Sequence, residues 1–299
     1  MKSYSIINDS SLSTSRGDGS LKHDFRCYTP KWTMEEVVMR DEVRDSLNDV
    51  ISFCKNREII VNQWHFNHFL KDNGAICINL YGEPGTGKTI AANAVVHAIG
   101  LKAVEVSLAE ILGDLQGQTE KNLSSLFQFA DNNNCVIIFN DADSLLSKRE
   151  SGGANSTSGN IHKDHLLNLL DTSRSVIIFT TNFMENYDDA FKSRMLFNIG
   201  IPLPNYQERL LIWKFHIDKS MPRTASYEEL ASVTEGLSGR NIRQIALTMG
   251  IRLTSNRLSS ITKDAVEIER NKILCSKNNT VETVAKENIP NEVLNKLNS

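Results

Sequence analysis

The sequence predicts an α/β protein, in which a parallel β-sheet carries helices on both faces and a small helical domain follows. Three observations support this fold class. Short apolar runs rich in β-branched residues alternate with helical segments between residues 76 and 203. A glycine-rich phosphate-binding motif follows the first of these runs, and after Pro204 only helical periodicity remains. Alternating strands and helices are typical of right-handed crossovers, which make the strands parallel and cover both faces of the sheet.

Each expected element rests on a local pattern. Residues 41–56 carry apolar side chains at helical spacing and are expected to form an amphipathic helix. The expected strands are apolar runs that cover residues 76–81, 103–107, 135–139, 175–181 and 198–203. The helices between them cover residues 88–99, 119–131 and 161–170. Beyond Pro204, helical patterns cover residues 206–218, 226–233, 239–254 and 262–272.

These elements divide the chain into four segments. Residues 1–30 hold seven serines in the first twenty positions and are expected to be a mobile N-terminal arm. Residues 31–204 are expected to form the α/β domain around the phosphate-binding loop. Residues 205–275 are expected to form a small helical lid domain, and residues 276–299 a polar C-terminal tail.

Composition excludes several classes of function. Lys and Arg total 33 and Asp and Glu total 36, and the resulting net charge of −3 argues against nucleic acid as the partner. No apolar run approaches the ~18 residues that span a bilayer. The N-terminus lacks the apolar core of a secretory signal. The five cysteines are widely spaced and form no C-x-x-C. We therefore expect a reduced, cytoplasmic protein with no membrane partner and no zinc.

A complete phosphate-binding loop motif lies between the first strand and the helix that follows. The pattern G-x-x-x-x-G-K-[ST] is matched in full by Gly82, Glu83, Pro84, Gly85, Thr86, Gly87, Lys88 and Thr89. The glycines let backbone N–H groups point at a phosphate, and the helix N-terminus adds partial positive charge. Lys88 would reach the β- and γ-phosphates, and Thr89 would ligate Mg²⁺ through its hydroxyl. The motif therefore predicts ATP and Mg²⁺ as cofactors.

Polar residues end the third strand, where a parallel sheet presents its ligands. Asn140 and Asp141 follow the apolar run 136–139. Sites of this kind usually carry first an Asp that holds Mg²⁺ through water, and then a Glu that polarises the attacking water. Asn140 lacks that negative charge, and the Asp141 carboxylate falls about 1.5 Å short of a Glu carboxylate. Three interpretations stay open. Hydrolysis is slow, or Asn140 is an engineered replacement that traps ATP, or Asp143 shares the role of the acid site. Asp143 also fits a helix cap.

With these motifs in this order, the chain resembles an AAA-plus ATPase of the AAA clade, the clade of spastin-like protein remodellers. The resemblance runs from about Trp32 to about residue 255. WTMEEVVMRDEVRDSL resembles the segment before the phosphate loop, and SLAEILGDLQGQTEKNLSSLF resembles the stretch with the first pore loop. Leu115, Gln116 and Gly117 occupy the place of an aromatic-hydrophobic-Gly pore motif. Leu115 in the aromatic position weakens the expectation that a peptide is threaded.

The resemblance implies roles for three further residues. Asn182, at the end of the fourth strand, matches the first sensor, whose amide holds the attacking water or the γ-phosphate. Arg194, in DDAFKSR, matches an arginine finger that projects into the nucleotide of the next subunit, with a plain surface arginine as the alternative. Arg240, in GLSGRNIR, matches a second-sensor arginine that reaches across the domain cleft. Arg243, one turn later, is its rival.

One departure suggests a subtype. The R-P-G-R-F-D phrase common in the clade is absent, and the segment reads DDAFKSRMLFNIGIPLP. This shorter version resembles the pachytene-checkpoint type of remodeller, which unfolds HORMA-domain proteins, and its bacterial anti-phage relatives.

Three functions follow as hypotheses. The first is an ATP hydrolase that forms a homo-oligomeric ring, expected to be a hexamer, and remodels a protein substrate delivered directly or by an adaptor. A HORMA-domain substrate in bacterial antiviral defence would be the specific case. The second is an ATP-binding switch with little hydrolysis, because of Asn140 and Asp141. The third is a DNA-handling ATPase, against which the acidic net charge weighs.

Overall fold

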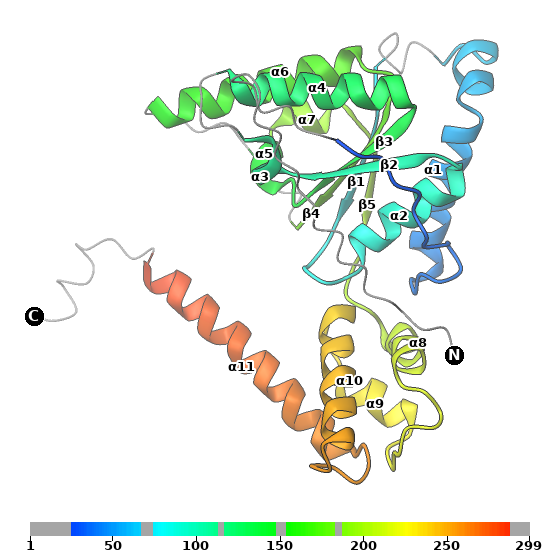
Figure 1. Ribbon diagram of the computed structural model, residues 1–299, viewed down its shortest axis with the longest axis vertical. Helices are drawn as coiled ribbons and strands as arrows, with labels where there is room; N and C mark the ends of the chain where they lie inside the picture. The colour runs from blue at the N-terminus through cyan, green and yellow to red at the C-terminus, as the bar shows by residue number, and fades with distance from the viewer. Residues whose placement is uncertain (1–24, 67–73, 113–116, 148–153, 183–186, 288–299) are drawn as a thin grey trace, which may run out of the picture.

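The computed structural model describes residues 25–66, 74–112, 117–147, 154–182 and 187–287. Within these ranges the chain forms a five-stranded sheet with helices around it and a helical C-terminal region (Figure 1). Residues 1–24 of the expected arm, the pore position Leu115 with Gln116, and the last residues of the expected tail lie outside the described residues.

The sheet confirms the predicted parallel architecture. Its strands are paired in parallel in the order β2-β3-β4-β1-β5. They are β1 (Ile76–Tyr81), β2 (Lys102–Ser107), β3 (Cys135–Asn140), β4 (Val176–Thr181) and β5 (Met195–Gly200). Because β1 lies between β4 and β5, the loop after β1 starts inside the carboxyl edge of the sheet, beside the end of the central strand β4.

The prediction of the last strand, at 198–203, is wrong by three residues. β5 starts at Met195, and the last ladder contact is the Ile201 N–H, which donates to the Tyr81 carbonyl over 2.7 Å. Pro202 and Pro204 follow, and proline has no N–H to donate to a neighbouring strand. The two prolines therefore end the strand and open the connection to the helical region.

Helices cover both faces of the sheet, and each face has its own apolar cluster. α1 (Asp41–Lys55) and α2 (Lys88–Ile99) pack on one face around Leu47, Val95 and Ile138. On the other face, Leu123, Leu166 and Phe179 belong to a second cluster beneath the next two helices (Figure 1). These are α4 (Gln118–Asn133) and α6 (Ala154–Thr172).

Short elements and one helix start differ from the expectation. The structure adds α3 (Leu108–Ile111), α5 (Asp143–Leu146), α7 (Asp189–Lys192) and a π-helix, η1 (Ile59–Gln63). α6 begins at Ala154, whereas the prediction began at 161. The prediction rested on apolar periodicity, which the polar stretch 154–160 lacks.

The helical region packs around its own core. It contains α8 (Tyr206–His216), α9 (Tyr227–Val233), α10 (Gly239–Thr254) and α11 (Lys263–Glu287). Trp213 is fully buried in this core, and its indole N–H donates to the Thr234 hydroxyl over 3.0 Å. Capping boxes at Asn205, Ser226 and Ser238 fix where the first three helices begin.

The last helix is longer than predicted. We expected it to end at 272 and a polar tail to begin at 276, but α11 continues to Glu287. The stretch 263–287 contains neither glycine nor proline, so nothing in the backbone chemistry ends the helix before Pro290. No helix among the described residues is both long and apolar enough to cross a membrane.

The segment 25–30 also differs from the expected mobile arm. Tyr28 forms an antiparallel bridge with Ala103 of β2, in which each N–H donates to the other residue's carbonyl over 2.9 Å. Phe25 and Cys27 are half-buried against the core. These residues therefore belong to the folded α/β domain.

Candidate nucleotide-binding site

The motif residues line a cavity of about 390 Å³ between the sheet domain and the helical region. Gly85 and Lys88 contribute from the loop after β1, and Asp141 and Asn182 from the ends of β3 and β4. Arg240 contributes from the start of α10. Most of the residues predicted from sequence are therefore brought to one place.

The rest of the lining is largely apolar or aromatic. Trp32 and Val37 come from the segment before α1, and Ile212 and Phe215 from α8. His216 also lines the cavity, and burial together with the nearby Arg243 guanidinium lowers its pKa, which favours the neutral imidazole. An apolar lining next to a phosphate-binding loop fits a nucleotide, whose base is flat and whose phosphates are anionic.

The loop itself is shaped by glycines. Gly82 has φ +151°, and a Cβ there would lie 2.1 Å from the Ile201 carbonyl oxygen. Gly85 has φ +83°, and a Cβ there would lie 2.7 Å from both Arg240 Cβ and Ser238 Oγ. α2 begins at Lys88, so its free N–H groups open toward the loop, where they suit a phosphate.

Lys88 lies at the centre of the polar contacts. Its ammonium donates to the Gly82 carbonyl over 2.7 Å, the Glu83 carbonyl over 3.0 Å and Asn182 Oδ1 over 3.0 Å. Each of the three N–H donors of the Lys88 ammonium thus has its own acceptor. Burial lowers the pKa of Lys88, while the carboxylates of Asp141 and Asp143 oppose that shift. A bound phosphate would replace one of these neutral acceptors with an anionic one.

The two residues predicted to hold Mg²⁺ lie side by side. Thr89 Oγ1 donates to Asn140 Oδ1 over 3.2 Å, and Thr180 Oγ1 donates to the same oxygen over 3.2 Å. Hydroxyl and amide oxygens are hard ligands of the kind that Mg²⁺ takes, so this pair fits the ion. Both groups are neutral, however, and no cluster of three His, Cys, Asp or Glu side chains suited to a metal occurs in the described residues.

Asp141 lies in an uncommon backbone conformation, with φ +49°, and is exposed. Its N–H donates to Thr180 Oγ1 over 3.4 Å. Asp and Asn tolerate positive φ better than most residues with a Cβ. The backbone at this position therefore supplies a physical reason for Asp where a Glu is usual.

Asp143 is placed differently from the helix cap that we considered. The cap position of α5 belongs to Ala142, and the Asp143 carboxylate instead binds Asn182. The Asn182 N–H donates to Oδ1 over 2.8 Å and its Nδ2 donates to Oδ2 over 3.0 Å. Asp143 thus fixes the amide so that Asn182 Oδ1 faces Lys88. Sequence could show Asp143 near the site, but not this contact across strands.

The two candidate second-sensor arginines both line the cavity. The Arg240 N–H donates to the Gly85 carbonyl over 3.1 Å, which joins the start of α10 to the phosphate loop. Arg243 lies one turn further along the same helix. The choice between their side chains stays open, while the backbone of Arg240 already links the two parts of the protein.

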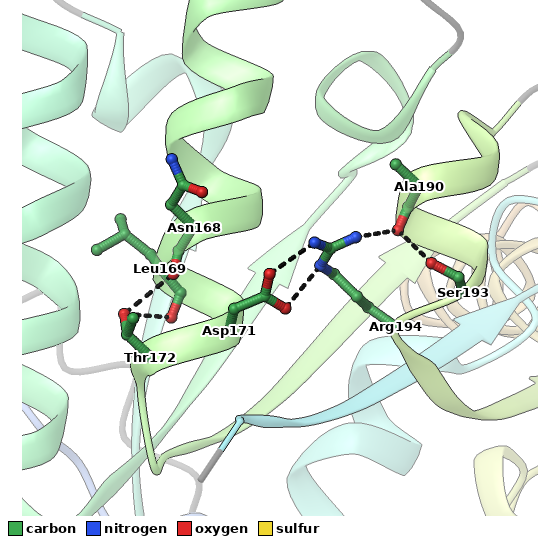
Figure 2. Close-up of polar contacts among 7 residues, drawn as sticks. All are labelled: Asn168, Leu169, Asp171, Thr172, Ala190, Ser193 and Arg194. Atoms are coloured by element: carbon green, nitrogen blue, oxygen red, sulfur yellow. Dashed lines mark hydrogen bonds and ion pairs between the residues drawn. The ribbon is translucent and has the colours of Figure 1, made fainter. Parts of the chain in front are cut away.

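Arg194 lies away from this cavity and is bound within its own chain (Figure 2). Its Nε donates to Asp171 Oδ1 over 2.9 Å, and its Nη2 donates to Oδ2 over 2.6 Å. Its Nη1 donates to the Ala190 carbonyl over 2.8 Å. The guanidinium therefore connects the end of α6 to α7, and its expected role toward a neighbouring subunit stays a prediction.

Comparison with known proteins agrees with this fold and site. Residues 78–203 match the family described as "ATPase family associated with various cellular activities (AAA)". Vacuolar protein sorting-associated protein 4 of Dictyostelium discoideum is 35% identical over 173 residues, which are 55% of this chain and 38% of that protein. The 26S proteasome regulatory subunit 8 homolog of Saccharomyces cerevisiae is 31% identical over 216 residues, 69% of this chain and 53% of that protein.

A third relative covers more of both chains. The putative 26S proteasome regulatory subunit homolog of Methanocaldococcus jannaschii is 26% identical over 268 residues, 84% of this chain and 69% of that protein. The chain thus spans between 38% and 69% of the length of these three curated relatives.

The match over residues 78–203 is to a family of ATPases, which is consistent with ATP hydrolysis. The relatives support an AAA-plus ATPase. They do not support the HORMA-remodelling type, to which only the short stretch that begins at Asp188 points.

Proposed function

We propose that this protein is an ATP hydrolase that works as a homo-oligomeric ring and remodels a protein substrate. The observation that carries the proposal is the convergence of Lys88, Thr89 and Asn182 at one side of a cavity that the helical region closes, with Asn140 hydrogen-bonded to Thr89. The residues that fit ATP are those of the loop 82–89, of which 84–89 line the cavity, with Arg240 across the cleft. Thr89 and Asn140 offer the oxygens that fit Mg²⁺.

Each residue has a task that its position supports. Lys88 carries the positive charge that pairs with phosphate oxygens. When bound, Mg²⁺ neutralises phosphate charge. Asn182, held by Asp143, presents an oriented amide beside Lys88, where it can position a water or a phosphate oxygen. Asp141 supplies the carboxylate that can accept a hydrogen bond from the attacking water.

The test is steady-state phosphate release from ATP by the full chain, with Lys88→Ala as the blank and Asn140→Asp as a comparison. Turnover above the blank supports the hydrolase. If the wild type is silent and Asn140→Asp turns over, the protein is the ATP-binding switch instead. If none of the three proteins releases phosphate and none binds ATP, the proposed function is wrong.

The ring is tested by mixing inactive variants. Arg194→Ala keeps an intact phosphate loop, and Lys88→Ala keeps an intact Arg194. If Arg194 acts on a neighbour, mixed rings contain some sites with both residues, and activity returns on mixing. Two inactive proteins that stay inactive after mixing, although they co-assemble, would contradict the role in trans.

The second candidate, the ATP-binding switch, is favoured by the neutral Asn140 and by the backbone of Asp141 at φ +49°. Asp141→Glu separates the candidates, because it restores the reach of a Glu at the expense of some backbone strain. We expect faster turnover in spite of lower stability. A variant that binds ATP as before and gains no turnover would favour the switch.

The nature of the partner is also a proposal. Two of the relatives carry names that refer to the proteasome and one to vacuolar protein sorting, which supports a protein as substrate or adaptor. The hexamer, the cytoplasmic location and a role in antiviral defence stay predictions. Neither DNA handling nor a HORMA-domain substrate gains support, and we propose neither.

A further inference from the structure

A carboxylate that the sequence motifs did not single out contacts the magnesium side of the site. Glu105 lies on β2, the strand next to β3, and its Oε1 accepts a hydrogen bond from Asn140 Nδ2. In the parallel register Ser107 lies opposite Asn140 and Glu105 opposite Ile138. Because side chains alternate along strands, Glu105 and Asn140 point to the same face of the sheet as diagonal neighbours.

The other oxygen of this carboxylate is held by Tyr28. The Tyr28 hydroxyl lies 2.6 Å from Glu105 Oε2, to which it donates, and 2.9 Å from Asn93 Oδ1 on α2. The Tyr28 backbone is fixed to Ala103 by the two bonds of the bridge. Burial and the Glu105 charge raise the pKa of Tyr28 well above its ordinary value, so the phenol keeps its proton and remains a donor.

The contact decides which way the Asn140 amide faces. With Nδ2 donating to Glu105, Oδ1 must turn toward Thr89 and Thr180, whose hydroxyls both donate to it. An amide oxygen is a ligand for Mg²⁺, whereas an amide NH₂ is not. The negative charge of Glu105 also polarises the amide and increases the electron density on its oxygen.

We propose that Glu105 is a positioning residue for the magnesium site, and that it supplies through Asn140 the negative charge that an Asp at position 140 would carry. Tyr28 holds Glu105 in place for this role. The inference rests on the proposed function, since it concerns how the same site binds ATP with Mg²⁺. Neither Glu105 nor Asn140 is among the residues that line the cavity, but Asn140 Oδ1 binds the hydroxyls of Thr89 and Thr180, which do line it. Glu105 therefore acts through Asn140 rather than on the nucleotide.

The test is the affinity of the full chain for fluorescently labelled ATP, measured with Mg²⁺ and again with EDTA. Glu105→Gln keeps the size of the side chain and removes its charge. We expect the gain in ATP affinity that Mg²⁺ provides to fall roughly 10-fold or more, in line with the loss when a partner of a metal ligand is removed. ATP affinity in EDTA should not change. Tyr28→Phe should also reduce the gain in ATP affinity that Mg²⁺ provides, but by less than Glu105→Gln.

A rescue variant separates positioning from a structural role. Asn140→Asp in the Glu105→Gln background brings its own carboxylate and should restore the effect of Mg²⁺. Asn140→Asp alone should gain little, because it places two carboxylates in contact. The matched control is Glu110→Gln, which removes an exposed carboxylate that binds the Ser107 N–H over 2.6 Å. We expect no change in the effect of Mg²⁺ for this control.

The outcomes are distinct. Glu105→Gln with an unchanged effect of Mg²⁺, or with equal losses of ATP affinity in Mg²⁺ and EDTA, would overturn the inference and leave the proposed function standing. Failure of Asn140→Asp to rescue a folded Glu105→Gln protein would also overturn it. A wild type that binds no ATP, with Lys88→Ala indistinguishable from it, would overturn the proposed function and this inference together.

Discussion

Replacing Gly85 by Ala tests the contact between the phosphate loop and the helical region. Gly85 has φ +83°, and an added Cβ would lie 2.7 Å from both Ser238 Oγ and Arg240 Cβ. The Gly85 carbonyl also accepts the hydrogen bond from the Arg240 N–H at 3.1 Å. No rotamer change removes a Cβ–Cβ overlap, so the start of α10 must move away from the loop.

The size of the effect follows from these distances. Ordinary carbon contacts lie at about 3.5–4.0 Å, so α10 must retreat by roughly 1 Å, enough to break the Arg240 hydrogen bond. A hydrogen bond of this kind contributes about 0.5–1.5 kcal/mol. Its loss should make the Arg240 amide hydrogen exchange roughly 2- to 13-fold faster. The positive φ adds about 1–2 kcal/mol of backbone strain to the loss in unfolding free energy.

The assay is hydrogen–deuterium exchange of the peptide that spans 238–242, measured without nucleotide. Gly87→Ala is the matched control, since Gly87 lies in the same loop with φ +105° but an added Cβ would meet nothing within 4 Å. Both variants should lose stability in thermal unfolding. Only Gly85→Ala should exchange faster at the start of α10. Equal exchange rates of this peptide in the two variants would refute the view that the missing Cβ of Gly85 lets the start of α10 lie against the phosphate loop.

Three further predictions follow from the described contacts. Asp143→Asn should lower kcat by about 100-fold with a smaller change in KM, because it weakens the contacts that hold the Asn182 amide. Phosphate release over a range of ATP concentrations measures both constants, and a change confined to KM would contradict this role. Asp171→Asn should lower the free energy of unfolding by about 1–2 kcal/mol in urea titrations, because Arg194 loses a charged partner; an unchanged midpoint would contradict a structural ion pair. Burial raises the pKa of Cys77 to about 12, so its thiol is protonated at pH 8 and should be labelled by thiol reagents only after denaturant is added.

The sequence was sufficient for most of the sheet. Four of the five strands lie within one residue of their predicted bounds, because each is a short apolar run next to a turn motif. The phosphate loop was predictable as well, since its glycines, lysine and threonine are contiguous. The last strand was misplaced because apolar content continues through Ile201 to Leu203, while hydrogen bonding ends at the first proline.

The supporting contacts of the site could not be predicted from the sequence. Asp143 and Asn182 are 39 positions apart, and Glu105 and Asn140 are 35 apart. These contacts depend on which strands are neighbours, and the order of the strands in the sheet cannot be predicted from local sequence patterns. The same holds for Arg194 and Asp171, which the fold joins across α6 and α7.

The bridge between Tyr28 and Ala103 has a consequence for solubility and for truncation. β2 is an outer strand of the sheet, and an outer strand offers unpaired backbone groups to which another chain can add. The segment 25–30 occupies part of that row. A shortened chain that begins at residue 31 would keep every phosphate-loop residue, yet it would expose this edge to self-association and leave the Glu105 carboxylate without its phenol.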